Sequence, residues 1–182
     1  MLKYLIVLSV FLVSGCATPT QKASGVLPAP NLKPNSFYRV DVTQQCVPYA
    51  RQMSGIQIRG DAHTWWKQAK GLYDRGQTPR KGAVIVLSKT DRLKHGHLAV
   101  VSDVIDSRTI EVAHSNWGGD KYTRSYVYEF MPVRDISKNN DWSKVKFWNY
   151  PSSSFGRVYP VSGFIYPKQD QSIMSLISEN LF

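Results

Sequence analysis

The chain has 182 residues, of which 42% are hydrophobic and 20% charged, so it is long enough and apolar enough to fold one domain around a core. This composition excludes a mostly disordered protein. The net charge of +10 favours a polyanionic partner, although a solvated basic surface explains the charge equally well. The 23 lysines and arginines are scattered and no nucleic-acid-binding motif is present, so no nucleic-acid partner is expected.

Residues 1–15 have the pattern of a secretory signal peptide. Lys3 precedes an apolar run of about ten residues, which is too short to span a bilayer. The run ends at residues 13–16 in Val-Ser-Gly-Cys, which resembles the lipobox of bacterial lipoproteins, so Cys16 is the expected lipidation site. A thioether at Cys16 would prevent a disulfide with Cys46, the only other cysteine. Each buried methylene contributes about 0.8 kcal/mol, so two or more acyl chains would anchor the protein to a membrane stably.

The residue after the lipobox indicates a location. Ala17, rather than aspartate, follows Cys16, which resembles an outer-membrane address in lipoprotein sorting of the Gram-negative type. We therefore expect a lipid-anchored protein of the bacterial cell envelope, in the outer membrane and facing the periplasm. Residues 16–36 contain four prolines among Thr, Ser, Gly and Asn, without a hydrophobic period, and are expected to form a tether.

A helix is expected to begin near Asp41 or Thr43, either of which can serve as its N-cap. Pro48 fits only within a first turn, so Cys46 should lie at or just before the helix N-terminus. Backbone N–H groups and the helix dipole favour a thiolate there, and the same N–H groups can stabilise an oxyanion. Gln45, or else Gln44, is a candidate for an additional oxyanion donor. The alternative role for Cys46 is that of a small buried apolar residue.

The middle of the chain predicts a second helix and several strands. The helix has Asp61 as its candidate N-cap and Gly71 as its stop. A tight turn near Asp106 joins two of the strands into an antiparallel pair. The expected helix covers residues 60–69, and the expected strands cover residues 83–87, 97–104, 109–113 and 122–130.

His97 opens one of these strands, directly after Gly96. Gly96 would let backbone or substrate approach closely. His95 lies two residues earlier and could share a face of the strand. A thiol and an imidazole followed by a side-chain amide are the parts of a papain-type cysteine nucleophile. A lone histidine in a strand can equally be a hydrogen-bonded structural residue.

Three segments resemble the CHAP family of cysteine amidohydrolases and peptidases, which mostly act on peptidoglycan. They are Gln-Cys-Val-Pro-Tyr-Ala-Arg at 45–51, Gly-Asp-Ala-x-x-Trp at 60–65 and Gly-His-Leu-Ala-Val-Val at 96–101. The resemblance extends from about residue 40 to a closing strand at 161–167. It implies that Cys46 is the nucleophile and that His97 is the base, with His95 as the second choice.

A third group should accept the remaining ring N–H of His97 and fix its tautomer. Asn116 is the first candidate for this orienting role, and His114 is the second. Many CHAP members have Glu-x-Asn where this chain has His114-x-Asn116. Without that carboxylate the strongest acceptor for an imidazolium is missing, which would lower the activity or shift its pH optimum.

The rest of the chain gives weaker signals. Residues 134–160 are polar and rich in aromatics, and we expect an irregular insertion whose aromatic side chains either line the groove or hold a long loop in place. Residues 168–182 form a C-terminal tail, either a short helix or a loose segment. One thiol and four scattered histidines do not match the close-spaced ligand pairs of zinc sites, so neither a metal nor a cofactor is expected.

Together these features predict a papain-like α+β fold over residues 37–167, with the nucleophile helix packed on an antiparallel sheet. The expected protein is a monomeric peptidoglycan amide hydrolase, either an N-acetylmuramoyl-L-alanine amidase or a crosslink endopeptidase. It would use Cys46, His97 and Asn116, and it would reach the membrane through its lipid anchor. The alternatives are a non-enzymatic envelope-binding lipoprotein on a CHAP scaffold and a small-molecule amidase.

Overall fold

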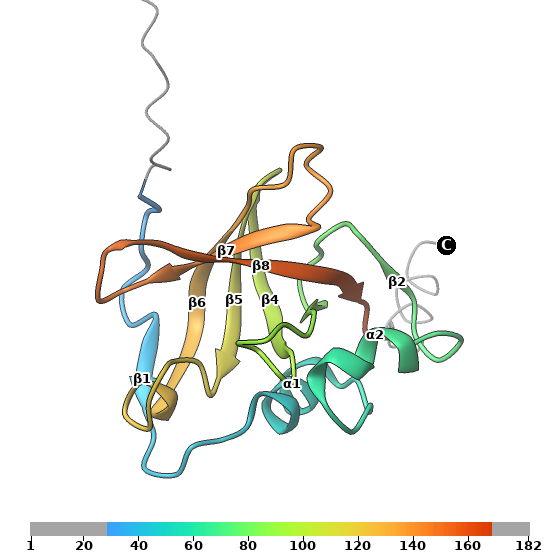
Figure 1. The fold of residues 1–182 in the computed structure, drawn as a ribbon, viewed down its shortest axis with the longest axis horizontal. Coiled ribbons are helices and arrows are strands. Elements are labelled where there is room, and N and C mark those ends of the chain that lie inside the picture. Colours follow the sequence, from blue (N-terminus) through green and yellow to red (C-terminus); the bar gives the residue numbers. More distant parts are fainter. Residues whose placement is uncertain (1–28, 169–182) are drawn as a thin grey trace, which may run out of the picture.

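The structure is a computed structural model that describes residues 29–168, and within them it contains eight strands and two α-helices (Figure 1). The strands are β1 (Phe37–Arg39), β2 (Arg75–Gly76), β3 (Val84–Leu87), β4 (His97–Asp106), β5 (Thr109–Ser115), β6 (Tyr126–Asp135), β7 (Lys144–Asn149) and β8 (Ser154–Ile165). The helices are α1 (Cys46–Ser54) and α2 (Trp65–Gln68), and short 3-10 helices cover Ala62–Thr64 and Thr123–Ser125.

Strands β3 to β8 close into an antiparallel barrel. They pair in chain order from β3 to β8, and β8 pairs back onto β3, which completes the ring. Strand β7 is the link that closes the ring, since it pairs with both β6 and β8. Strand β1 adds to β6 and β2 adds to β8, so these two strands lie outside the ring.

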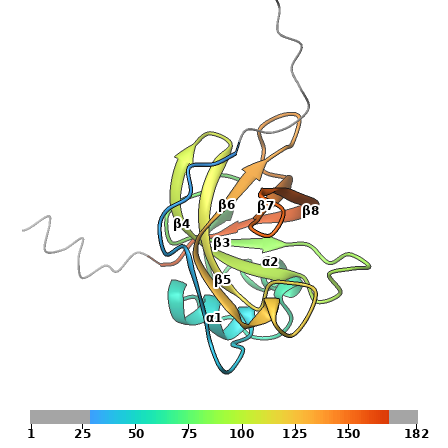
Figure 2. The same cartoon turned by 90° about the vertical axis from the view of Figure 1, so that its left-hand side faces the viewer.

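Alternate residues of β3 and β4 face two different cores. Ile85 of β3 and Ala99 of β4 belong to the core inside the barrel. Val86 and Leu98 point outward and form a second core with Trp65 of α2 and other residues of the two helices. Figure 2 shows α1 and α2 together on the outside of the barrel. Figure 1 shows that they lie at the end where β4 begins and β5 ends.

The predicted papain-like α+β fold is therefore wrong, because the domain is mostly a closed β-barrel with two short helices. The error lies in residues 134–160, which supply β7 and the first half of β8 instead of an irregular insertion. Strand β7 alternates exposed Lys144 with buried Val145 and buried Phe147. Trp142 and Trp148 are also buried in the barrel interior, so these aromatic residues form the core rather than hold a loop in place.

The segment before β1 packs along the outside of the barrel. Lys33 forms ion pairs with Glu111, which is buried, and with Asp103 at 3.4 Å, and its ammonium group lies over the ring of Phe130. The hydrogen bond with Glu111 is the main reason that the pKa of Lys33 is raised. In Figure 1 the blue segment that precedes β1 enters on the side of the barrel away from α1.

Some predicted segments lie outside the described residues. These are the signal peptide 1–15, the lipidation site Cys16, the tether before residue 29 and the tail after residue 168. Among residues 29–168, no helix has the length and apolar character needed to cross a membrane.

The alternation along β7 gives a stability prediction. Val145→Ala should lower the free energy of unfolding by about 2 kcal/mol, because it removes two buried methyl groups from the barrel interior. The neighbouring exposed change Lys144→Ala should stay within about 0.5 kcal/mol. Urea unfolding of the full chain measures both values. Equal small losses would contradict the closure of the barrel by β7.

Candidate functional site

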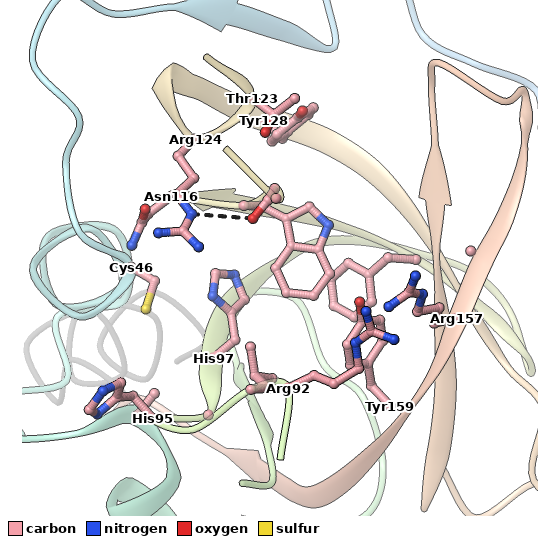
Figure 3. A pocket seen from close by; sticks show the side chains of 18 of the residues that line it. Cys46, Arg92, His95, His97, Asn116, Thr123, Arg124, Tyr128, Arg157 and Tyr159 are labelled. Atoms are coloured by element: carbon pink, nitrogen blue, oxygen red, sulfur yellow. Dashed lines mark hydrogen bonds between the residues drawn. The ribbon is translucent and has the colours of Figure 1, made fainter. Parts of the chain in front are cut away.

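A cavity of about 1200 Å³ opens at the end of the barrel beside α1. It is lined by Cys46 at the start of α1, His97 at the start of β4 and Asn116 just after β5. Figure 3 shows these side chains with the Arg and Tyr residues farther along the cavity. Its volume exceeds the usual range for a pocket that holds one small ligand, so an extended substrate fits it better.

Cys46 is the first residue of α1, as the sequence predicted. The helix begins one residue after Gln45, whose extended backbone (φ −68°, ψ 148°) places it at the N-cap without a side-chain capping bond. Neither Asp41 nor Thr43 is the cap. The backbone N–H of Tyr49 donates to the Gln45 carbonyl at 3.1 Å, which is the first turn of the helix. Pro48 lies within this turn, where its missing N–H costs nothing.

The thiol of Cys46 is held in its protonated form. Burial raises the pKa of Cys46, and the backbone N–H groups of Leu98, Val47 and Cys46 itself lower it only in part. The contact with Leu98 places the sulfur beside the residue that follows His97. Burial therefore outweighs the helix N-terminus, which alone would favour the thiolate. The sequence predicted a site that favours the thiolate, whereas in the resting protein burial favours the protonated thiol.

His97 is buried and lies on the inward face of β4, with a second histidine against it. The Nε2 of His97 is 2.9 Å from Nδ1 of His114 on β5, and the ring planes are 78° apart. Val100 pairs with Ala113, so His97 and His114 are diagonal neighbours on two adjacent strands. Burial lowers the pKa of His97 to about 3. Burial and the proximity of His97 lower the pKa of His114 well below its usual range.

Met131 determines which nitrogen of each ring carries the proton. Its Sδ lies 3.2 Å from Nε2 of His114, and a thioether sulfur can only accept a hydrogen bond. The neutral His114 ring therefore carries its proton on Nε2 and accepts at Nδ1. His97 must then donate from Nε2, which leaves its Nδ1 with a free lone pair. Cys46 and His97 line the same cavity (Figure 3), and among the described residues no hydrogen bond joins the thiol to this nitrogen.

Asn116 lies apart from this pair. Its φ of +57° turns the chain out of β5, and its Nδ2 donates to Oε1 of Gln45 at 2.7 Å. Among the described residues no hydrogen bond joins Asn116 to His97, whose ring nitrogen instead meets His114. The geometry thus favours His114 over Asn116 as the orienter. This hydrogen bond uses the amide oxygen of Gln45 and not its N–H₂ group, so Gln45 remains a candidate oxyanion donor.

The other histidines lie outside the pair. His95 is exposed, and its Nδ1 is 3.2 Å from a carboxylate oxygen of Asp61. His63 contacts the His95 carbonyl through its own Nδ1 at 3.2 Å. Among residues 29–168, no group of three or more His, Cys, Asp or Glu side chains is arranged to hold a metal ion.

The sequence did not indicate several residues around the histidine pair. The ring of Trp117 lies 4.6 Å from that of His97 and 5.1 Å from that of Tyr159. Tyr128 and Phe147 lie 5.1 and 5.5 Å from His114 and help to keep it dry. Trp117 directly follows Asn116, which was the only available signal. No such signal pointed to Met131, because a methionine in a strand usually indicates a residue of the hydrophobic core.

A cysteine at a helix N-terminus facing a buried histidine provides the components of a cysteine–histidine nucleophile site. Residues 35–116 match the model of the family described as the CHAP domain, which confirms the predicted resemblance. The CHAP family is generally hydrolase-related, with functions of the peptidoglycan amidase or peptidase type. No curated protein matches the chain at a significant level. Strands β6, β7 and β8 lie beyond the matched range.

The pKa shifts predict the pH dependence of Cys46 alkylation. His97 stays neutral far below its usual pKa of 6.5, so no inflection should appear near that pH. The raised pKa of Cys46 means that the thiolate forms only at alkaline pH, so the rate should rise toward the upper end of a range from about pH 4 to about pH 9. Iodoacetamide labelling of the full chain measures the rate. A fast plateau well below pH 8 would contradict the neutral resting pair.

A change at His114 tests its contact with His97. His114→Glu should speed alkylation near neutral pH about tenfold, because a carboxylate at Nε2 of His97 favours the imidazolium, which stabilises the thiolate. His114→Gln is the neutral control and should change the rate little. The same rate in both variants would show that residue 114 does not act on His97 through its charge.

Gly96 positions the start of β4, and its substitution should be costly. Its φ is +70°, and an added Cβ would approach the Leu87 carbonyl oxygen and the His63 backbone nitrogen at 2.7 Å. Gly96→Ala should therefore destabilise the protein by about 1–3 kcal/mol. Gly119→Ala, in open space on the same cavity, is the matched control. Thermal unfolding compares the two variants, and equal midpoints would rule out this constraint.

Proposed function

We propose that this protein is a peptidoglycan amide hydrolase, either an N-acetylmuramoyl-L-alanine amidase or a crosslink endopeptidase. One observation carries the proposal: Cys46 and His97 face the same cavity within the stretch that matches the CHAP family. The two residues come from different elements, α1 and β4, which the outer core holds together.

Attack begins from the neutral pair. As the Cys46 sulfur attacks the amide carbonyl carbon, Nδ1 of His97 takes the thiol proton. The C–N bond then breaks and His97 gives this proton to the departing amine, leaving a thioester on Cys46. Water attacks the thioester carbonyl while His97 takes its proton. That proton returns to the sulfur as the C–S bond breaks, which releases the carboxylic acid.

Groups beside the cysteine and the histidine support this sequence of steps. His114 accepts the Nε2–H of His97 and so keeps Nδ1 basic toward the thiol. The Cys46 backbone N–H, at the start of α1, is placed for a developing oxyanion, and the Gln45 amide is a second donor. Asn116 holds the Gln45 side chain in place by donating a hydrogen bond to its Oε1, and among the described residues it makes no hydrogen bond with His97. Its loss should therefore affect oxyanion binding more than the basicity of His97.

The cavity suits a polymer better than a small amide. Its walls carry half-buried aromatic side chains from several elements, which can pack against sugar or peptide. These residues are Trp117, Tyr128, Tyr150 and Tyr159. The expected lipid anchor at Cys16 would place the protein in the compartment that holds peptidoglycan. The small-molecule amidase is thus the weaker alternative.

A non-enzymatic envelope-binding protein is the second candidate. The observation that favours it is the chemistry of the resting site, where a protonated thiol faces a neutral histidine with no carboxylate behind it. Such a site could hold peptidoglycan without cleaving it.

Digestion of purified sacculi by the full chain separates the two candidates. We expect new chain ends, with a freed L-alanine amine for an amidase or new peptide termini for an endopeptidase. Cys46→Ala and His97→Ala should reduce cleavage by more than about a thousandfold. The exposed change His95→Ala is the matched control and should keep activity. Binding without new ends, equal in wild type and Cys46→Ala, would establish the non-enzymatic alternative instead.

A further inference from the structure

Two arginines converge on one end of the cavity from separate parts of the chain. Arg92 comes from the loop between β3 and β4, and Arg157 comes from β8. Both act on Tyr159: burial raises the pKa of this tyrosine, while the charges of Arg157 and Arg92 oppose the rise. Figure 3 shows the two guanidinium groups and the Tyr159 side chain in the same part of the cavity.

Neither guanidinium has a partner within residues 29–168. The ion pairs of this range engage Asp61, Asp103, Glu111 and Asp135, and none involves Arg92 or Arg157. Neither side chain takes part in a hydrogen bond or stacks on a ring there. Other arginines of the described range do stack on aromatic rings or pair with acids, namely Arg39, Arg75, Arg80, Arg108 and Arg134.

The charged side chains that line the cavity are mostly positive. Arg92, Arg157 and Arg124 line it, and Arg124 donates to the Gly118 carbonyl at 3.2 Å (dashed in Figure 3). Among the described lining residues the one carboxylate is Asp61, which His95 already contacts. Unpaired cations with apolar walls create a positive potential that attracts an anionic group.

A further polar group on the cavity wall also lacks a partner. The indole N–H of Trp148 is buried without a hydrogen-bond acceptor, although Trp148 lines the cavity. Buried N–H groups are nearly always paired, so an acceptor from a bound molecule would satisfy this one.

The distance from the reacting residues limits the position of the anionic group. Two ring contacts lead from His97 to Tyr159 through Trp117, with centroid distances of 4.6 and 5.1 Å. An extended peptide advances about 3.3 Å per residue, so the Tyr159 ring lies within the reach of about three residues from the His97 ring.

We propose that Arg92 and Arg157, beside Tyr159, form a binding subsite for a carboxylate of the substrate, within about three residues of the scissile amide. The protein would then prefer stem peptides with free carboxylates over amidated ones. This inference rests on the proposed peptidoglycan function and specifies which chemical form of peptidoglycan the site takes.

Cleavage of two matched muropeptides tests the subsite. One has free stem-peptide carboxylates, and the other has them converted to carboxamides. Arg92→Gln and Arg157→Gln in the full chain should each lower kcat/KM for the acidic peptide about tenfold to a hundredfold and leave the amidated peptide nearly unchanged. Arg80→Gln, at an arginine that stacks on Tyr166 outside the cavity, is the control and should behave as wild type. Equal losses on both peptides would overturn the proposal.

Binding to the full-length Cys46→Ala protein separates this inference from the proposed function. The subsite is supported if Cys46→Ala binds the acidic peptide more tightly than the amidated one and the double variant Cys46→Ala/Arg157→Gln does not. This outcome supports the subsite even if the wild type cleaves neither peptide. Equal binding of the two peptides, or no binding of either, overturns the subsite even if the wild type cleaves both. A peptide with a phosphate in place of the carboxylate is the third arm, and tighter binding of that peptide would also overturn the carboxylate assignment.

Discussion

The double pairing of β7, to β6 on one side and to β8 on the other, is the constraint on which the site depends. It closes the barrel and so turns the inward faces of β4 and β5 into a sealed interior. His97 and His114 lie at the mouth of that interior, where Phe147 of β7 itself forms part of the wall. A barrel left open at β7 would let water reach both rings, and both would recover ordinary basicity.

Closure has a chemical consequence for the order of proton and bond movements. In a dry site without a carboxylate an imidazolium is costly, so in the proposed mechanism the proton moves from the thiol to the imidazole only while the sulfur attacks. The free energy needed to form the imidazolium is then part of the activation barrier for the attack. The backbone N–H groups at the start of α1 and the Met131–His114–His97 series are fixed beforehand, which keeps further reorganisation small. We expect such a site to work slowly but to resist adventitious alkylation and oxidation, because both need the thiolate.

Sequence patterns predicted the local elements better than their assembly. Cys46 lies at a helix start, as Pro48 indicated, although neither predicted cap is used. His97 at a strand start and the turn after Asp106 are also where the sequence indicated. The barrel escaped prediction because β7 carries lysines and an interrupted alternation, with a register shift near Trp148. Asn116 was the reasonable first choice as orienter, since continuing the β5 register would set it opposite His97. Its positive φ removes it from the strand, and nothing in a single sequence reveals that turn.

The ion pair between Lys33 and Glu111 has a mechanical consequence. It fastens the segment before β1 to the outer face of β5, and this segment enters on the side of the barrel away from α1 (Figure 1). A pull on the N-terminal side therefore acts on the far end of the barrel and not on the helix that carries Cys46. The ion pair thus fixes where the chain leaves the domain on its N-terminal side, and the end of the barrel that carries the cavity bears no part of that load.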